Sequence, residues 1–301
     1  MPPSTDQCRV LSAHRGDPIL GTAFPASRVL LVEQPGGWGA AGLAASKFDP
    51  TIAKRLIANL GLHGIRVLAI RRPGRQPAPD RRSWGFADCR PGHRGIVWGT
   101  FEEDRELLLF DPETVLARGS ASAQAHIPVF AVCAHGTHDV CCAVQGRPIA
   151  AALERLRPGQ VWECSHVGGD RFAANVLVLP DGQLYGRVPE SAVEDVVAAA
   201  EDGRVVAELL RGQIGLAPAV QAALAYAHHR LGPYRIADLV VRSAETALDG
   251  TERVRLGTPA GEVTVTVVVE SGETALLTCR AVAMSTPLVY RPVSMAAVQA
   301  G

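Results

Sequence analysis

The sequence predicts an α/β protein in which two similar modules are followed by an α+β extension. Apolar runs and amphipathic stretches follow the order strand–helix–strand–hairpin–helix twice, over residues 27–122 and 123–204. After Arg204 the pattern changes to two helical stretches and a run of β-branched residues, which we assign to an extension at 205–301. Residues 1–26 are rich in proline and show no sustained pattern, so we expect a leader with a single helical turn.

The first module begins with a short apolar run at 28–33, which suits a buried strand. A glycine-rich segment at 34–39 lacks the lysine of a P-loop and the glycine spacing of a dinucleotide site, so we expect a tight turn with Trp38 packed over it. Asp49 and Pro50 start a helix, because a carboxylate suits the N-cap and proline suits the first helical position. Further strands are predicted at 65–70, 96–99 and 106–110.

The second module repeats this order, and a turn at 180–182 with proline and glycine joins the strands of its hairpin. Ser191 and Glu194 form a capping box that starts the last helix of the module. The predicted elements are strands at 129–132 and 161–163, a helix at 148–156, hairpin strands at 176–179 and 184–187, and a helix from 191 to 202.

The extension combines two predicted helices, at 205–210 and 219–231, with an antiparallel meander. His228 and His229 lie near the end of the second helix, where we expect surface residues because a cationic imidazole suits the helix dipole. The meander strands are predicted at 253–256, 263–269 and 275–279. Cys279 ends the last of these strands, where we expect a thiol packed in the core.

The chain of 301 residues has a formal net charge of zero, so no overall field attracts it to nucleic acid or to an anionic membrane. No apolar run approaches the ~18 residues that a membrane-spanning helix requires. The N-terminal residues lack the basic and then apolar pattern of a signal peptide. We therefore expect a cytoplasmic protein, in which a dense cysteine and histidine cluster indicates metal binding or catalysis rather than disulfides.

Such a cluster lies in the second module, and a soft-metal or iron-sulfur site explains it better than packing does. Cys133 ends a predicted strand, and a short polar loop separates it from the adjacent Cys141 and Cys142. A loop of this length can wrap one iron or zinc between two thiolates, although the spacing does not decide whether Cys141 or Cys142 faces inward. The crowded residues are Cys133, Cys141, Cys142, Cys164, His135, His138 and His166.

The second pair of ligands is expected from the loop that follows the next predicted strand. Cys164, His166 and Asp170 are the donors in this loop. Gly168 and Gly169 lie between them and would let backbone amides approach the metal or its sulfides. Hydrogen bonds of this kind tune the reduction potential of an iron-sulfur cluster.

Three motifs follow one another between residues 133 and 187. They read Cys-x-His-Gly-x-x-Asp-x-Cys-Cys, then Trp-Glu-x-Ser-His-x-Gly-Gly-Asp-Arg-Phe-Ala-x-Asn, then Leu-Pro-x-Gly-x-x-Tyr-Gly-Arg. In this order they resemble the sucrase/ferredoxin-like family. The resemblance implies a thioredoxin-like ferredoxin module that carries a 2Fe-2S cluster, here preceded by a similar module without one. No carboxylate pair stands in a recognisable glycosidase setting, so the sequence gives no support to sucrase activity.

The resemblance also implies a ligand set of two cysteines and two histidines. Matched residue by residue, the cysteines fall on Cys133 and Cys142, and the first histidine falls on His166. The position of the second histidine holds Asp170. Either this carboxylate completes the set, or Cys164, a softer donor, replaces it, or the cluster is labile. The implied protein is a one-electron carrier rather than a catalyst. A ligating imidazole would couple electron transfer to a proton. The electron would be exchanged with a redox partner protein such as a reductase.

Two other functions fit the same residues. A structural zinc site would use Cys133, Cys142, Cys164 and His166 as tetrahedral ligands. A thiol oxidoreductase on a thioredoxin-like fold would use Cys141 or Cys142 as its nucleophile, although the sequence contains no Cys-x-x-Cys motif.

An arginine-rich stretch after residue 70 gives this neutral protein a local positive charge. Charge patches steer the encounter of two proteins more than they add affinity, so the stretch is a predicted docking surface for an acidic redox partner. A solvated loop is the alternative interpretation. The arginines of this patch are Arg71, Arg72, Arg75, Arg81 and Arg82.

Overall fold

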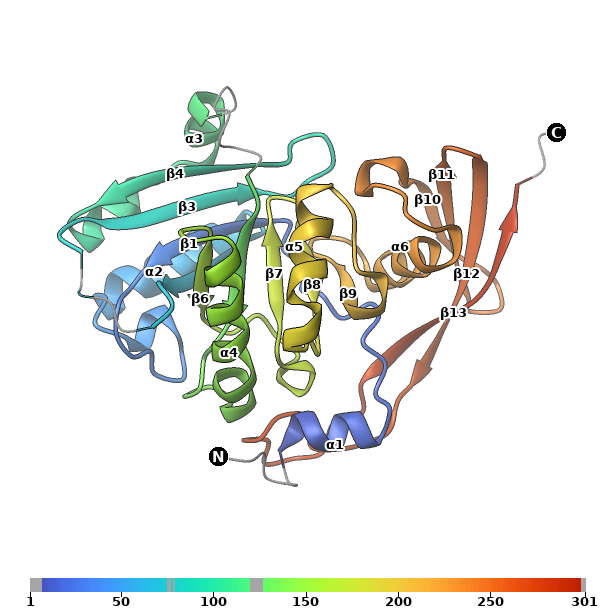
Figure 1. The fold of residues 1–301 in the computed structure, drawn as a ribbon, viewed down its shortest axis with the longest axis horizontal. Helices are drawn as coiled ribbons and strands as arrows, with labels where there is room; N and C mark the ends of the chain where they lie inside the picture. Colours follow the sequence, from blue (N-terminus) through green and yellow to red (C-terminus); the bar gives the residue numbers. More distant parts are fainter. Residues whose placement is uncertain (1–6, 75–76, 78, 120–126, 299–301) are drawn as a thin grey trace.

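The computed structural model describes residues 7–74, 77, 79–119 and 127–298. A large mixed sheet of nine strands occupies the middle of the molecule, with helices packed against it (Figure 1). A separate antiparallel sheet of four strands lies toward the C-terminus. This architecture confirms the predicted α/β class. Among the helices of the described residues, none has the length and apolar character of a membrane-spanning segment.

The large sheet repeats one arrangement in its two halves. Its strands are β1 Arg28–Glu33, β2 Ile65–Arg71, β3 Arg82–Asp88, β4 Gly95–Phe101, β5 Val129–Cys133, β6 Val161–Cys164, β7 Val176–Leu179, β8 Gln183–Tyr185 and β9 Leu210–Gln213. They lie in the order β4-β3-β1-β2-β6-β5-β7-β8-β9. β1 pairs in parallel with β2 and antiparallel with β3, and β5 pairs in the same way with β6 and β7.

The two halves meet where β2 pairs antiparallel with β6. This seam consists of Ile70 opposite Cys164 and Arg71 opposite Glu163. One continuous sheet therefore runs through both predicted modules. The seam also sets the first half directly beside the strand that leads into the second loop of the predicted site.

Helices complete the two halves and present apolar side chains to the core. Asp49 caps the helix α2 as predicted, since its Oδ1 accepts the backbone N–H groups of Thr51 at 2.8 Å and Ile52 at 3.0 Å. α2 packs on the first half, and α4 and α5 pack on the second half (Figure 1). The helix bounds are α1 Cys8–His14, α2 Pro50–Leu62, α3 Pro112–Gly119, α4 Val140–Leu156, α5 Val193–Glu201 and α6 Pro218–Leu231.

The C-terminal extension is the second sheet together with α6, which packs against it. Alanine and leucine side chains of α6 share an apolar cluster with Val254, Leu256 and Val265 of this sheet. α6 separates the second sheet from β9 (Figure 1). The strands of the second sheet are β10 Val240–Thr246, β11 Glu252–Thr258, β12 Gly261–Ser271 and β13 Leu288–Ala297.

Two of the predicted strands are wrong. Residues 106–110 belong mostly to a 3-10 helix, Asp104–Leu109. The Glu106 carboxylate accepts the backbone N–H groups of Glu102 and Glu103 at 2.9 and 2.6 Å, and this local capping outweighs the apolar pattern. Residues 275–279 contribute a single bridge to the residues before β13, so Cys279 lies in a loop.

Two predicted helix features are also wrong. Within the predicted helix 205–210, a 3-10 turn covers only Ala207–Leu209, and β9 begins at Leu210. Ser191 lies in a 3-10 turn, and α5 begins at Val193 with Ala192 as an N-cap that has no side-chain bond. The predicted capping box of Ser191 and Glu194 is therefore absent.

His228 is buried, contrary to the prediction, whereas His229 is exposed. Burial lowers the pKa of His228 to about 4. The unfolded chain takes up a proton near pH 6.5, before the folded chain does, so stability is lost as the pH falls from there toward about 4.

We expect the free energy of unfolding to drop by about 2 kcal/mol more between pH 7 and pH 5 in the native chain than in His228→Gln. Urea unfolding of both proteins at the two pH values measures this difference. His229→Gln is the control and should behave like the native chain. Equal acid sensitivity of the native chain and His228→Gln would contradict the prediction.

Candidate metal centre

The predicted ligand loop joins β5 to α4. β5 ends at Cys133, and Asp139 caps α4 by accepting the backbone N–H of Cys141 at 2.9 Å. Gly146 faces the end of β5, and a Cβ atom there would overlap the Cys133 carbonyl group. Glycine thus lets α4 start directly against β5, and this packing brings Cys142 next to Cys133.

Cys133 and Cys142 form a pair of buried thiols. Their mutual interaction lowers the pKa of Cys133 and raises the pKa of Cys142. Burial disfavours the charged form of both thiols. The pair therefore ionises in two separate steps, and a bound cation would favour the loss of the second proton.

Asp170 lies at the centre of a second group of side chains. Its Oδ1 lies 2.9 Å from His166 Nδ1 and 3.1 Å from Cys142 Sγ. Its Oδ2 lies 3.7 Å from His138 Nε2, and the rings of His138 and His166 are 3.8 Å apart between centroids. Burial opposes ionisation of Asp170, but His166 beside it holds the pKa of the carboxyl group below its usual range.

This group has the features of a metal-binding site. Within the described ranges, His166 Nδ1 and Asp170 Oδ2 have no hydrogen-bond partner, although His166 Nδ1 lies 2.9 Å from the other carboxylate oxygen, Asp170 Oδ1. Buried polar atoms almost always have a hydrogen-bond partner, so two unpaired atoms side by side indicate a site for a bound metal ion. One donor atom from each of His138, His166 and Asp170 lies within 4.8 Å of the others. With the adjacent thiols, the donor set suits iron or zinc.

Residues 21–212 match the family model described as Sucrase/ferredoxin-like. The chain belongs to the sucrase/ferredoxin-like family. The matched region covers both halves of the large sheet and all of the predicted ligands, and it ends before α6 and the second sheet. No curated protein and no solved structure matches the chain.

In this member of the sucrase/ferredoxin-like family, the glycine-rich segment of the first half covers the ligand loop of the second. His135 Nδ1 accepts the backbone N–H of His166 at 3.2 Å, so its Nε2 carries the proton and donates to the Gly39 carbonyl at 2.8 Å. Trp38 packs edge-on against His135, and Thr137 donates to the Trp38 carbonyl. The turn was predicted, but its contact with the site was not. Since both nitrogens of His135 are used, this histidine shapes the loop.

Gly168 and Gly169 make their described hydrogen bonds through their carbonyl groups, so the predicted approach of their amides to a metal stays a prediction. The two carbonyls accept from Arg211 Nη1 at 2.8 Å and Asn175 Nδ2 at 3.0 Å. Both glycines have positive φ, which fits the sharp turn of this loop. Arg211 also donates to Asn175 Oδ1 at 2.8 Å.

Arg211 was missed by the sequence analysis, because it lies on β9, far along the chain from the site. Its guanidinium is 1% exposed, and burial lowers its pKa to about 9. At neutral pH it therefore stays protonated. The nearby negative charges of Asp170, Cys133 and Cys142 favour this charged state.

Cys164 lies opposite Cys133 in the pairing of β5 with β6. It is fully buried in an apolar cluster with Trp162, and this burial raises the pKa of its thiol. Across the described residues, no hydrogen bond joins Cys164 to Asp170. Its sulfur is therefore close to the thiol pair but outside the hydrogen-bonded group.

Cys141 points away from this centre, which answers the question that the spacing left open. Cys142 Sγ contacts Asp170, whereas Cys141 Sγ lies 3.7 Å from Cys8 Sγ and 3.4 Å from Cys279 Sγ. Neighbouring residues of a helix face directions about 100° apart, which accounts for the difference. Cys279 is partly exposed among these side chains and is not the core thiol that was predicted.

The predicted arginine patch is largely engaged in contacts within the chain. Arg71 pairs with Glu163 at 2.7 Å, and Arg82 pairs with Asp104 at 2.5 Å. The other two described arginines, Arg72 and Arg81, contact the Trp162 ring and Glu102. Arg75 lies outside the described residues.

Proposed function

We propose that this chain is a one-electron carrier that holds a 2Fe-2S cluster between the thiol pair Cys133–Cys142 and the group of His166 and Asp170. One observation supports this most directly: the Asp170 carboxylate lies between a thiol of the first pair and the imidazole of the second. A cluster with two irons needs two such pairs of donors. When bound, the cluster accepts and releases one electron.

The two sides of this cluster would differ in their exposure to solvent. Cys133 and Cys142 bind from the interior, where Arg211 offsets their negative charge. The His166 side chain is 26% exposed, so its ring can exchange a proton with solvent. Imidazole in place of thiolate also raises the reduction potential, as it does in Rieske centres. A change in the protonation of this ring would change the charge of the centre, so the potential should depend on pH.

Asp170 is our proposed fourth ligand, and His138 and Cys164 are its alternatives. Asp170 supports this role by its contact with Cys142 and by its unpaired Oδ2 within the described structure. His138 lies in the same group, and imidazole is a softer donor than carboxylate. Cys164 is the softest donor of the three, but it is packed in the apolar cluster.

The proposal is tested by purifying the full chain without oxygen. We expect about two iron and two sulfide per chain, and a visible spectrum that bleaches with dithionite. Asp170→Ala should change the EPR spectrum of the reduced protein, whereas His138→Ala and Cys164→Ala should leave its g-values in place. A colourless protein with zinc bound by Cys133 and Cys142, and without sulfide, would instead establish the structural zinc site.

An electron carrier requires a donor, and we propose a reductase protein as the redox partner of this chain. His138 and His166 form the solvent-facing side of the centre, so they mark the surface that such a partner would approach. The arginine patch remains a proposed docking surface through Arg81, whose side chain is 59% exposed.

A further inference from the structure

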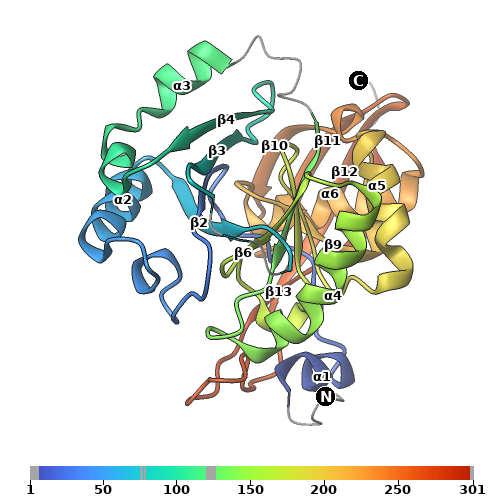
Figure 2. The ribbon, with the colours of Figure 1, turned by 60° about the vertical axis from the view of Figure 1, so that its left-hand side comes forward.

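A second group of metal-binding side chains lies at the start of α4, on the side opposite to Cys142. We propose that Cys8, Cys141, Cys279 and Asp139 bind one Zn²⁺ ion. One ligand atom from each of them lies within 4.8 Å of the others. They come from α1, from the start of α4 and from the loop that joins β12 to β13, and these segments lie side by side in Figures 1 and 2.

The spacing of these donors is that of a tetrahedral zinc site. Cys141 Sγ lies 3.7 Å from Cys8 Sγ and 3.4 Å from Cys279 Sγ. Cys8 Sγ lies 3.6 Å from Asp139 Oδ2. Zinc bonds of about 2.3 Å to sulfur and about 2.0 Å to oxygen place neighbouring sulfurs about 3.8 Å apart, and sulfur and oxygen about 3.5 Å apart. These three distances differ from the tetrahedral values by at most a few tenths of an ångström, and the remaining donor pairs lie within 4.8 Å.

Hydrogen bonds hold these donors in place. The Asp139 carboxylate accepts the backbone N–H groups of Cys141 at 2.9 Å and Cys279 at 2.7 Å. The backbone N–H of Cys8 donates to Cys279 Sγ at 3.4 Å. Such N–H groups around the first ligands orient them and favour thiolates. The site is therefore organised before any ion binds.

The composition of the group favours a cation over a disulfide. A disulfide would join two of the three thiols and leave the third beside Asp139, which is fully buried. In the described part of the chain, no ion pair joins Asp139 to a basic side chain, so a divalent cation would supply the missing positive charge. Zinc binding would release the three thiol protons to water and would oxidise or reduce no bond.

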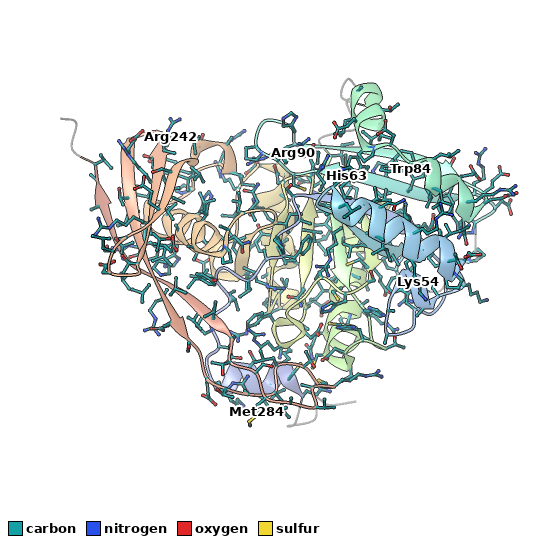
Figure 3. The ribbon with its side chains drawn as sticks, turned by 180° about the vertical axis from the view of Figure 1, so that it is seen from behind. Lys54, His63, Trp84, Arg90, Arg242 and Met284 are labelled. Carbon is teal, nitrogen blue, oxygen red and sulfur yellow. The ribbon has the colours of Figure 1, made fainter. Side chains whose placement is uncertain are left out.

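This site would fasten both ends of the chain to the helix that carries Cys142. The two arms of the segment between β12 and β13 are joined by the Ala275–Ser285 bridge, a backbone hydrogen bond from Gly272 to Pro287 and a contact of the Thr274 and Thr286 hydroxyls. Its tip is held to α1 and to Asp139 through Cys279. Figure 3 shows Met284 of this segment next to α1, seen from behind. A zinc ion would add metal–ligand bonds to these contacts. The protein would then hold a structural metal ion in addition to the proposed cluster.

The test is metal analysis of the full chain and of two variants, purified under reducing conditions with zinc in the medium. We expect about one zinc per native chain, and at least a tenfold loss of zinc in Cys8→Ser and in Cys279→Ser. Both variants should keep their iron and sulfide. Cys89→Ala, which removes a buried thiol from the other face of the protein, should keep its zinc.

Cobalt substitution tests the same site with a spectroscopic readout. The native chain should show thiolate-to-cobalt charge-transfer bands, and Cys279→Ser, at the partly exposed position, should lose them. Absence of zinc from the native chain, retention of zinc in both variants, or a disulfide between two of these cysteines would overturn the inference. A protein without iron but with this zinc would contradict the proposed function and leave the zinc site standing.

Discussion

If the chain binds the proposed cluster, Cys142→Ser is expected to lose its iron. Cys142 is the one cysteine whose sulfur contacts both Cys133 and Asp170, and a serine hydroxyl is a poor ligand for iron-sulfide. Iron should fall from about two atoms per chain to about 0.2 or less, since loss of a ligand exceeds the 10–100-fold cost of losing its supporting contacts. The visible absorbance should fall in proportion.

The serine side chain has nearly the volume of cysteine, so the fold should persist, as circular dichroism would show. Cys89→Ser serves as the matched control and should keep full iron and sulfide. Cys89 is buried beside the turn at Gly182, and no hydrogen bond among the described residues joins its thiol to Cys142 or Asp170. If Cys142→Ser kept its iron and Cys141→Ser lost it, the assignment of the inward-facing cysteine would be wrong.

Arg211→Met is expected to lower the free energy of unfolding by about 3 to 5 kcal/mol. Arg211 Nη1 donates to Gly168 and Asn175, and its Nε and Nη2 donate to the Thr22 hydroxyl at 3.0 Å and the Thr22 carbonyl at 2.5 Å. Methionine fills much of the space but leaves four acceptors without this donor: Asn175 Oδ1, which is buried, and three partly buried oxygens of Gly168 and Thr22. The melting temperature should fall by about 10 °C in this chain of 301 residues.

Arg147→Met is the matched control, because Arg147 is exposed on α4, and its melting temperature should change by less than about 1 °C. Differential scanning fluorimetry of the chain without added metal measures both variants. A melting temperature of Arg211→Met equal to that of the native chain would show that the guanidinium contributes no net stability.

Local pattern was enough to predict most of the large sheet and the position of the ligand loop. Strands such as 28–33 and 129–132 are buried on both faces, so they form continuous apolar runs that are visible in the sequence. The start of α2 at Asp49 was also predictable, because an N-cap depends only on its own first turn. The order of Cys133, Cys142 and His166 followed from motifs of adjacent residues.

The contacts that complete the two proposed metal sites join residues far apart in the sequence, and no local sequence pattern predicts such contacts. Cys8 and Cys279 are 271 residues apart, and only the folded chain sets α1 against the loop before β13. His138 was not among the predicted ligands, although its ring lies 3.8 Å from that of His166 and its Nε2 lies 3.7 Å from Asp170 Oδ2. Arg211 looked like any surface arginine, because its burial depends on β9 joining the edge of the sheet.

The pairing of β2 with β6 has a consequence for any shortened version of this protein. A fragment that begins near residue 127 would contain each proposed iron ligand, and yet it would lack Trp38, Gly39 and Ala40, whose carbonyls hold the loop between β5 and α4. Water would then reach His135 from the side that the missing residues occupy. Dividing the chain between its two similar halves would therefore separate the proposed cluster ligands from the segment that covers the ligand loop.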